Sequence, residues 1–152
     1  IKEDLSRKDT LEYAKELTSS MEDGRIKLYI TYKALGLRRK MREVFEKGEY
    51  IPLEAAGTRS EHVIAFARRF LNTMIIVVVP RFLTKILSLP DTTFPEMWED
   101  TMVIVPESSE GATFRNVLTG EELARTRRQG LSGLACSGLF RNLPVALLET
   151  GR

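Results

Sequence analysis

The sequence predicts an α+β protein in which two N-terminal helices precede an antiparallel β-sandwich. Between residues 11 and 37, apolar side chains recur at spacings of three and four, which is typical of amphipathic helices. From residue 50 onward, the apolar runs are short, rich in β-branched residues and separated by turn-forming residues, which is typical of strands. A group of strands that follows a group of helices indicates an α+β chain whose β part is a sandwich.

The first helix is expected within residues 1–22. Leu11, Ala14, Leu17 and Met21 fall on one helical face, so they predict a stripe that needs a partner. Ser6, with Asp9 three residues later, resembles a capping box. Gly24 is the expected stop, because glycine readily adopts the left-handed conformation that ends helices.

The second helix is expected over residues 25–42. Its apolar stripe is broad, which implies packing on more than one neighbour. The stripe consists of Ile26, Tyr29, Ile30, Lys33 and Leu37, widened by Leu28, Tyr32 and Leu35. The basic residues Arg38, Arg39, Lys40 and Arg42 fall in the last turns, where cations favour the negative end of the helix dipole.

The β part is predicted to be built around a central hairpin. Residues 63–67 and 74–79 are apolar on both faces, so each face of this pair needs a covering layer. Arg68 and Arg69 mark the turn, where the hairpin is expected to reach solvent. Further strands are expected at residues 50–53, 102–105, 112–118 and 144–148, which makes five or six in all.

The connections between these strands are expected to be less regular. Residues 81–87 are expected to form a short helix or loop, and residues 89–97 to be irregular. Residues 107–111 should form a turn, and residues 129–138, rich in small residues, a mobile connection. The predicted division is a helical segment over residues 1–43 and a β-sandwich domain over residues 44–152.

Composition narrows the class of protein. The chain has 152 residues, the size of one domain, and its 29% charged and 43% hydrophobic residues are ordinary for a soluble globular protein. The formal charge of +2 gives no indication of nucleic-acid or membrane binding. Cys136 is the single cysteine, so nothing indicates an oxidising compartment, and a cytoplasmic protein is expected. Because the chain begins at Ile1, it is expected to be part of a longer one.

No catalytic, cofactor or metal site is predicted from residue types. His62 and Cys136 stand alone, and no phosphate-binding glycine loop, dinucleotide fingerprint or nucleophile elbow is present. Trp98 and Asp100 are the candidate sugar contacts, because an aromatic ring with adjacent acids is suited to gripping a sugar. The alternative is that Trp98 packs at a strand entrance with the acids in solvent.

Eight stretches, in the same order, resemble the C-terminal region of the malto-oligosyltrehalose synthases, glucosylmutases of the alpha-amylase superfamily. The first four are DGRIKLYIT at 23–31, ALGLRRK at 34–40, FEKGEYIPLEAAG at 45–57 and EHVIAFARR at 61–69. The other four are VVVPRF at 77–82, WEDT at 98–101, NVLTGE at 116–121 and LPVALL at 143–148. Residues 1–22 and 122–138 carry little of this resemblance.

The resemblance implies a division of labour. In that family a (β/α)8 barrel carries three catalytic carboxylates, and a C-terminal β-sandwich packs against it. The family converts the reducing-end α-1,4 bond of a maltodextrin to an α,α-1,1 bond, which belongs to trehalose biosynthesis. This chain has no counterpart of the barrel motifs, so no catalytic residue is assigned and the isolated chain is expected to be inert. Asp23, Arg25 and Lys27 of the DGRIK stretch are the candidates for active-site support, with helix capping as the alternative.

The expected partners are therefore the catalytic barrel of the same polypeptide and, in the full-length enzyme, maltodextrin. Self-association of the chain through the apolar surface that the barrel would cover is also expected. A second hypothesis is a glucan-binding module that uses Trp98, Phe94 and Tyr50. A third is a nucleic-acid module that uses residues 38–42 and 125–128, although aromatic residues are not interleaved with these charges. The preferred reading has neither a nucleic-acid nor a membrane partner.

Overall fold

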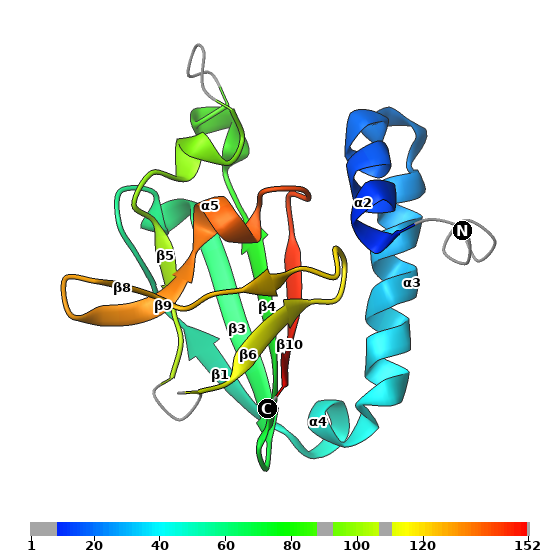
Figure 1. Ribbon diagram of the computed structural model, residues 1–152, viewed down its shortest axis with the longest axis vertical. Helices are drawn as coiled ribbons and strands as arrows, with labels where there is room; N and C mark the ends of the chain where they lie inside the picture. The colour runs from blue at the N-terminus through cyan, green and yellow to red at the C-terminus, as the bar shows by residue number, and fades with distance from the viewer. Residues whose placement is uncertain (1–8, 88–92, 107–110, 152) are drawn as a thin grey trace.

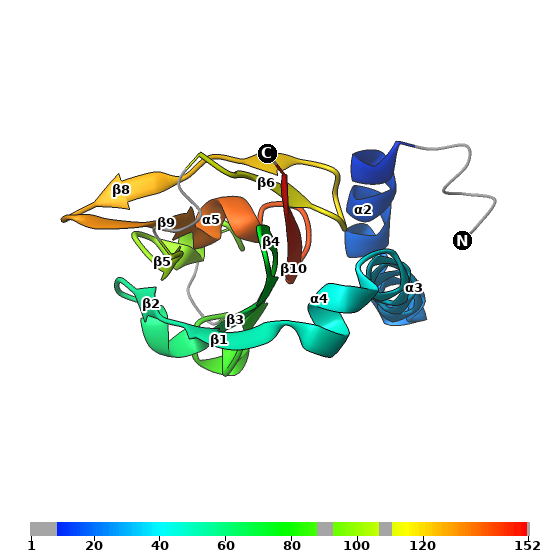
Figure 2. The ribbon, with the colours of Figure 1, turned by 90° about the horizontal axis from the view of Figure 1, so that it is seen from below.

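The computed structural model describes residues 9–87, 93–106 and 111–151. It has two antiparallel sheets, with a pair of helices standing on one side of them (Figure 1). Figure 2, seen from below, shows the same helices beside the outer face of the larger sheet. The predicted α+β class is confirmed. Ser6, the turn at 107–110 and residues 88–92 of the irregular stretch lie outside the described residues.

The first helix, α2, spans Thr10–Ser19. The Asp9 side chain accepts a hydrogen bond from the backbone N–H of Leu11 at 2.8 Å, so Asp9 itself is the N-cap. Leu17 is buried as predicted, but Met21 is 48% exposed, because the chain has already left α2 for a 3-10 turn, η1 (Met21–Asp23). The buried face also includes Tyr13, which the spacing argument missed.

The second helix, α3, spans Arg25–Lys40 and is followed after Met41 by a short helix, α4 (Arg42–Lys47). The sequence predicted one helix over residues 25–42 and no helix directly after it, so α4 was missed. Val44 is buried on α4, and Arg42 pairs with Glu46 within α4 rather than lying in the last turn of α3.

The larger sheet has six strands in the order β1-β3-β4-β10-β6-β7. These strands are β1 (Glu49–Leu53), β3 (Val63–Phe70), β4 (Thr73–Pro80), β6 (Thr113–Asn116), β7 (Glu122–Leu123) and β10 (Ala146–Gly151). The smaller sheet has four strands in the order β2-β5-β9-β8. These are β2 (Ala55–Ala56), β5 (Met102–Ile104), β8 (Thr126–Arg128) and β9 (Leu131–Ala135). The short segments η2 (Ser60–His62), η3 (Leu83–Lys85), η4 (Glu96–Trp98) and α5 (Cys136–Leu139) connect them.

The central hairpin is confirmed, since β3 and β4 pair antiparallel from Val63 opposite Pro80 to Phe70 opposite Thr73. Two details differ from the prediction. Only β4 is buried on both faces in its middle, whereas β3 alternates and leaves Ile64 44% exposed. Arg68 is only partly exposed, because its Nη2 donates to the backbone carbonyls of Phe45 (2.9 Å) and Gly48 (3.0 Å) at the end of α4.

The connection predicted to be mobile is regular. Residues 126–128 and 131–135 form the β8–β9 hairpin, and α5 follows directly. Gln129 and Gly130 have φ values of 49° and 79°, so both central turn residues are left-handed, as two-residue hairpins favour. Small side chains here permit a close approach between strands, because a Cβ on Gly133 would collide with the Val103 carbonyl oxygen. The small residues that suggested a mobile connection therefore serve close packing between strands.

Two apolar cores lie on opposite faces of the larger sheet. The inner core, between the sheets, contains Ile76 and Val78 of β4, together with Trp98 and Phe140. The helix-side core lies between the outer face of the sheet and the helices, and contains Leu17, Tyr29, Leu37, Ile75 and Leu147. The inner face of the central hairpin therefore contacts a covering layer, as its apolar sequence required, whereas its outer face is covered by the helices only around Ile75.

Candidate functional site

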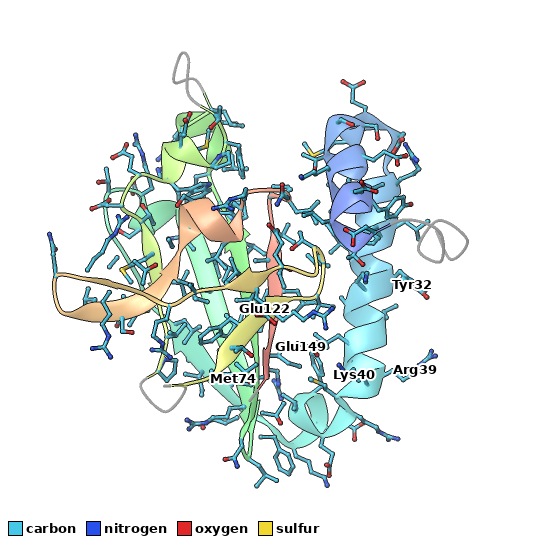
Figure 3. The ribbon with its side chains drawn as sticks, viewed as in Figure 1. Tyr32, Arg39, Lys40, Met74, Glu122 and Glu149 are labelled. Carbon is cyan, nitrogen blue, oxygen red and sulfur yellow. The ribbon has the colours of Figure 1, made fainter. Side chains whose placement is uncertain are left out.

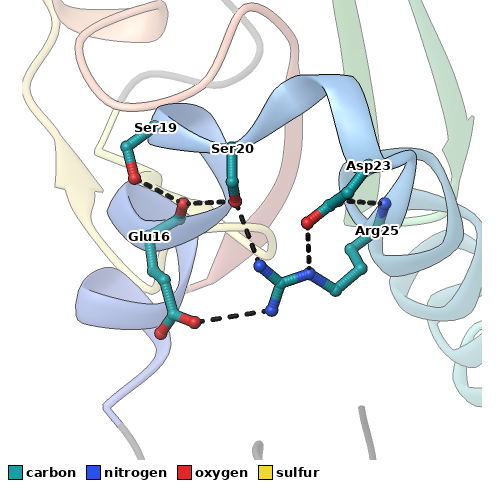
Figure 4. Close-up of polar contacts among 5 residues, drawn as sticks. All are labelled: Glu16, Ser19, Ser20, Asp23 and Arg25. Carbon is teal, nitrogen blue, oxygen red and sulfur yellow. Dashed lines mark hydrogen bonds and ion pairs between the residues drawn. The ribbon is translucent and has the colours of Figure 1, made fainter.

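The DGRIK residues lie at the junction between α2 and α3 (Figure 4). Gly24 adopts a left-handed conformation (φ 76°) and turns the chain from η1 into α3. One Asp23 carboxylate oxygen accepts from the backbone N–H of Arg25 at 2.9 Å, and the other accepts from Arg25 Nε at 2.6 Å. The same guanidinium reaches back to Ser20 Oγ at 3.1 Å and Glu16 Oε1 at 3.5 Å. Arg25 therefore ties the two helices together.

The contacts of Arg25 also favour the ionised form of the Asp23 carboxylate. The pKa of Asp23 is lowered, first by the hydrogen bond from the Arg25 backbone and then by the Arg25 side chain. A carboxylate with a lowered pKa that accepts two hydrogen bonds is a poor proton donor, so Asp23 is suited to holding the start of α3 rather than to acid catalysis. Lys27 is exposed, and its ammonium has no ion pair with the residues that the structure describes. Of the three candidates for active-site support, only Lys27 is uncommitted.

Trp98 is fully buried, with 0% of its surface exposed. Its ring lies 4.8 Å from that of Phe140 and 5.9 Å from that of Phe94, within the inner core. A stacked sugar needs an open aromatic face, so the expectation that Trp98 contacts sugar is corrected in this conformation. The alternative reading, a tryptophan packed at the entrance of β5, describes what is found. The same burial removes Trp98 from the glucan-binding hypothesis.

Asp100 lines a surface pocket of about 320 Å³, together with Met102 and Leu131 among others. Its Oδ1 accepts from the Thr58 backbone N–H at 2.8 Å, which is the main reason that the pKa of Asp100 is lowered. Arg128 also lines the pocket, and its positive charge favours the same ionised carboxylate. A carboxylate and a guanidinium at one small pocket are suited to hydroxyl groups, which both donate and accept hydrogen bonds.

The described residues offer few groups that are suited to catalysis. His62 is buried, with Nδ1 3.3 Å from the Arg81 carbonyl oxygen. Burial raises the pKa of the Cys136 thiol to about 12, so it is not a ready nucleophile. Over residues 9–87, 93–106 and 111–151, no three His, Cys, Asp or Glu side chains gather as metal ligands would. No helix among them is both long and apolar enough for a membrane span.

One surface feature was only partly anticipated. Leu28, Tyr32 and Leu35 of α3 are 60%, 41% and 58% exposed. We call these three residues the α3 stripe. They lie one helical turn apart on the side opposite Ile26, Tyr29 and Leu37, which enter the helix-side core. The predicted breadth of the apolar surface was right, but only one of its two sides has a neighbour in the described chain.

Comparison with known proteins gives one informative result. No protein-family model matches the chain, and no curated protein matches it. A solved structure does: a point mutant of maltooligosyltrehalose synthase from Arthrobacter ramosus is similar, with a TM-score of 0.62 and 29% sequence identity. The similarity covers 91% of this chain and 16% of that chain. This chain thus spans about one sixth of the enzyme that it resembles.

The fold and this similarity define a class: an α+β chain consistent with the C-terminal, β-rich domain of an amylase-type enzyme. Within that class, the chain is structurally related to a domain of maltooligosyltrehalose synthase. The resemblance drawn from the eight stretches and the similarity in structure identify the same enzyme.

Proposed function

We propose that the chain is a non-catalytic accessory domain of a maltooligosyltrehalose synthase, and that it stabilises the catalytic barrel of that enzyme. The observation that carries the proposal is the similarity over 91% of the chain to 16% of a solved synthase. In this proposal the whole enzyme rearranges the reducing-end α-1,4 bond of a maltodextrin to an α,α-1,1 bond. The barrel supplies the chemistry, and this chain supplies contact surface.

The α3 stripe supports the contact role. One side of α3 is buried in the helix-side core, and the α3 stripe on its other side is exposed to solvent. Burying apolar surface stabilises a protein by roughly 25 cal/mol for each Å², and the exposed stripe does not contribute this stabilisation. Leu28 and Leu35 are each more than half exposed, so a covering layer would stabilise the folded state. A barrel packed against α3 is the layer that we propose.

Two experiments test the proposal. The isolated chain, incubated with maltohexaose, should give no trehalose-ended product by chromatography; conversion would overturn the non-catalytic assignment. The coding DNA upstream of Ile1 should contain an in-frame barrel with its carboxylates. A start codon next to Ile1 would instead leave a stand-alone domain.

In the longer protein, Leu28→Asp combined with Leu35→Asp should strongly reduce the soluble yield, because two charges would be buried at the barrel contact. Thr31→Asp is the matched control: it adds one charge to the same helix beside the stripe and should have little effect. Equal yields for both variants would contradict a contact through the α3 stripe.

Glucan binding is the second candidate, and the Asp100 pocket favours it. Titration with maltotriose, followed by the amide NMR signals of Gly57 and Leu131, tests it directly. If the pocket binds sugar, Asp100→Asn should weaken the shifts. No shifts in the unmodified chain would end this candidate.

A further inference from the structure

A second apolar surface lies on the outer face of the larger sheet, beside α3 but not under it. It consists of alternate residues of three neighbouring strands: Tyr50 and Pro52 of β1, Ile64 and Phe66 of β3, and Val79 of β4. The register places Pro52 opposite Phe66 and Ile64 opposite Val79. We call this set the sheet strip. Tyr50 and Ile64 are 55% and 44% exposed, and the Tyr50 ring stacks on Phe66 at 5.1 Å.

The sheet strip is the uncovered half of a face whose other half is buried. At β4 and β10 the outer face enters the helix-side core through Ile75 and Leu147. Towards β1 this cover ends, and neither Phe66 nor Val79 packs against either core among the described residues. Three adjacent strands span about 10 Å, since strands lie roughly 4.8 Å apart. That width accommodates one α-helix, whose diameter with side chains is about 10 Å.

The chain itself carries a helix face that suits such a surface. The α3 stripe presents Leu28, Tyr32 and Leu35 at one-turn spacing, and Arg39 continues the same row one turn further. Figure 3 shows Tyr32 and Arg39 directed away from both sheets. The stripe therefore cannot reach the strip of its own molecule, but it is open to another one.

Charges at the edges of the two surfaces are complementary. The α3 stripe is flanked by exposed basic residues, Lys27, Arg38 and Arg39. One end of the sheet strip carries two exposed acidic residues, Glu54 beyond Pro52 and Glu61 before Ile64. Two cations also lie near the strip: Arg81, whose Nε donates to the Glu61 carbonyl oxygen, and Arg68, which is held by the α4 carbonyls. An acidic end on one surface and a basic border on the other favour a defined orientation.

We infer that this chain binds a second copy of itself, with the α3 stripe of one copy seated on the sheet strip of the other. The inference needs only the two described surfaces and does not depend on the proposed function. Within a longer enzyme the α3 stripe is assigned to the barrel, so the two uses exclude each other. Self-association is then a property of the chain when no barrel covers α3.

Analytical ultracentrifugation of the chain, over a concentration series, tests the inference with two variants. Leu35→Asp disables the helix surface and Ile64→Asp disables the strip, so each variant alone should associate at least about tenfold more weakly than the parent chain. An equimolar mixture should form a 1:1 complex, because it retains one intact helix and one intact strip. Thr31→Asp and Asn72→Asp are the matched controls and should associate like the parent chain.

Each alternative geometry gives a different result. A parent chain that stays monomeric at all concentrations overturns the inference. Association of Ile64→Asp alone indicates helix-to-helix contact, association of Leu35→Asp alone indicates strip-to-strip contact, and both overturn it. An equimolar mixture of Leu35→Asp and Ile64→Asp that remains monomeric also overturns the inference. If either variant fails to fold by circular dichroism, the reversals Arg39→Glu and Glu54→Lys replace them: each alone should weaken association, and the mixture of the two should restore it.

Discussion

Trp98 and Phe140 lie with their ring centroids 4.8 Å apart and their planes tilted by 46°, in the middle of the inner core. The indole is closed from solvent, and its Nε1 has no hydrogen-bond partner among the described residues. Trp98 therefore holds the sandwich together by packing, and its polar atom contributes nothing to this.

Truncation of this ring should be costly. Trp98→Ala should lower the free energy of unfolding by about 3–5 kcal/mol, the usual cost of removing a large buried aromatic side chain. Trp98→Phe should cost less than about 2 kcal/mol, because it removes an unpaired buried donor while keeping most of the ring. Denaturant unfolding measures both. Equal losses would mean that the indole N–H has a partner in solution.

The contact between Tyr29 and Leu118 should make stability depend on pH at the alkaline end. The Tyr29 hydroxyl donates to the Leu118 carbonyl oxygen at 2.6 Å, and burial, with a smaller effect of Tyr13, raises the pKa of Tyr29 to about 12. A raised folded-state pKa stabilises the protein fully below the unfolded pKa of about 10, and the effect is lost as pH rises towards 12. Denaturant unfolding between pH 9 and 11.5 should show this decline.

The Tyr29→Phe variant is the control for that titration. It should lower stability by about 1–3 kcal/mol near neutral pH, because the Leu118 carbonyl loses its partner in a buried site. Above pH 10 its stability should fall less steeply than that of the parent chain. Parallel pH profiles would assign the decline to other groups.

Two glycine substitutions should act in opposite directions. Gly36 lies inside α3 with open space around it, so Gly36→Ala should stabilise the chain by roughly 0.5–1 kcal/mol through helix propensity. Gly133 lies in β9 against the Val103 carbonyl, so Gly133→Ala should destabilise it by about 1–3 kcal/mol through overpacking. Thermal unfolding of both variants checks the pair. A stabilised Gly133→Ala would show that β5 and β9 are not packed this closely.

Arg68 should not be replaceable by lysine. Its planar guanidinium donates to three carbonyl oxygens in and just after α4, those of Val44, Phe45 and Gly48. Arg68→Lys keeps the charge but loses the fork of donors, so we expect most of the loss seen in Arg68→Ala, about 1–3 kcal/mol. Unfolding midpoints of the two variants measure this. Full retention of stability in Arg68→Lys would leave charge alone as the contribution.

Local pattern in the sequence was enough for much of the fold. Helical periodicity predicted α2 and α3, and the apolar runs around residues 63–79 predicted the central β3–β4 hairpin. These features depend on residues that are close in sequence, so local periodicity is enough to predict them. The eight ordered stretches led to the same enzyme that the similarity in structure supports.

Contacts between distant residues decided the rest. Arg68 lies near a hairpin end and was predicted to reach solvent, but the segment around the end of α4, some 20 residues earlier, supplies it with three carbonyl acceptors. Trp98 lies beside two acids in the sequence, which suggested a sugar contact. In the structure Phe140, some 40 residues later, packs against the indole ring, and Trp98 is buried. Burial and hydrogen bonding across such sequence separations depend on where the sheets and helices meet, which a local pattern does not record. The sequence by itself therefore determined which helices and central strands form, and the tertiary structure alone decided which of their side chains remain open to a partner.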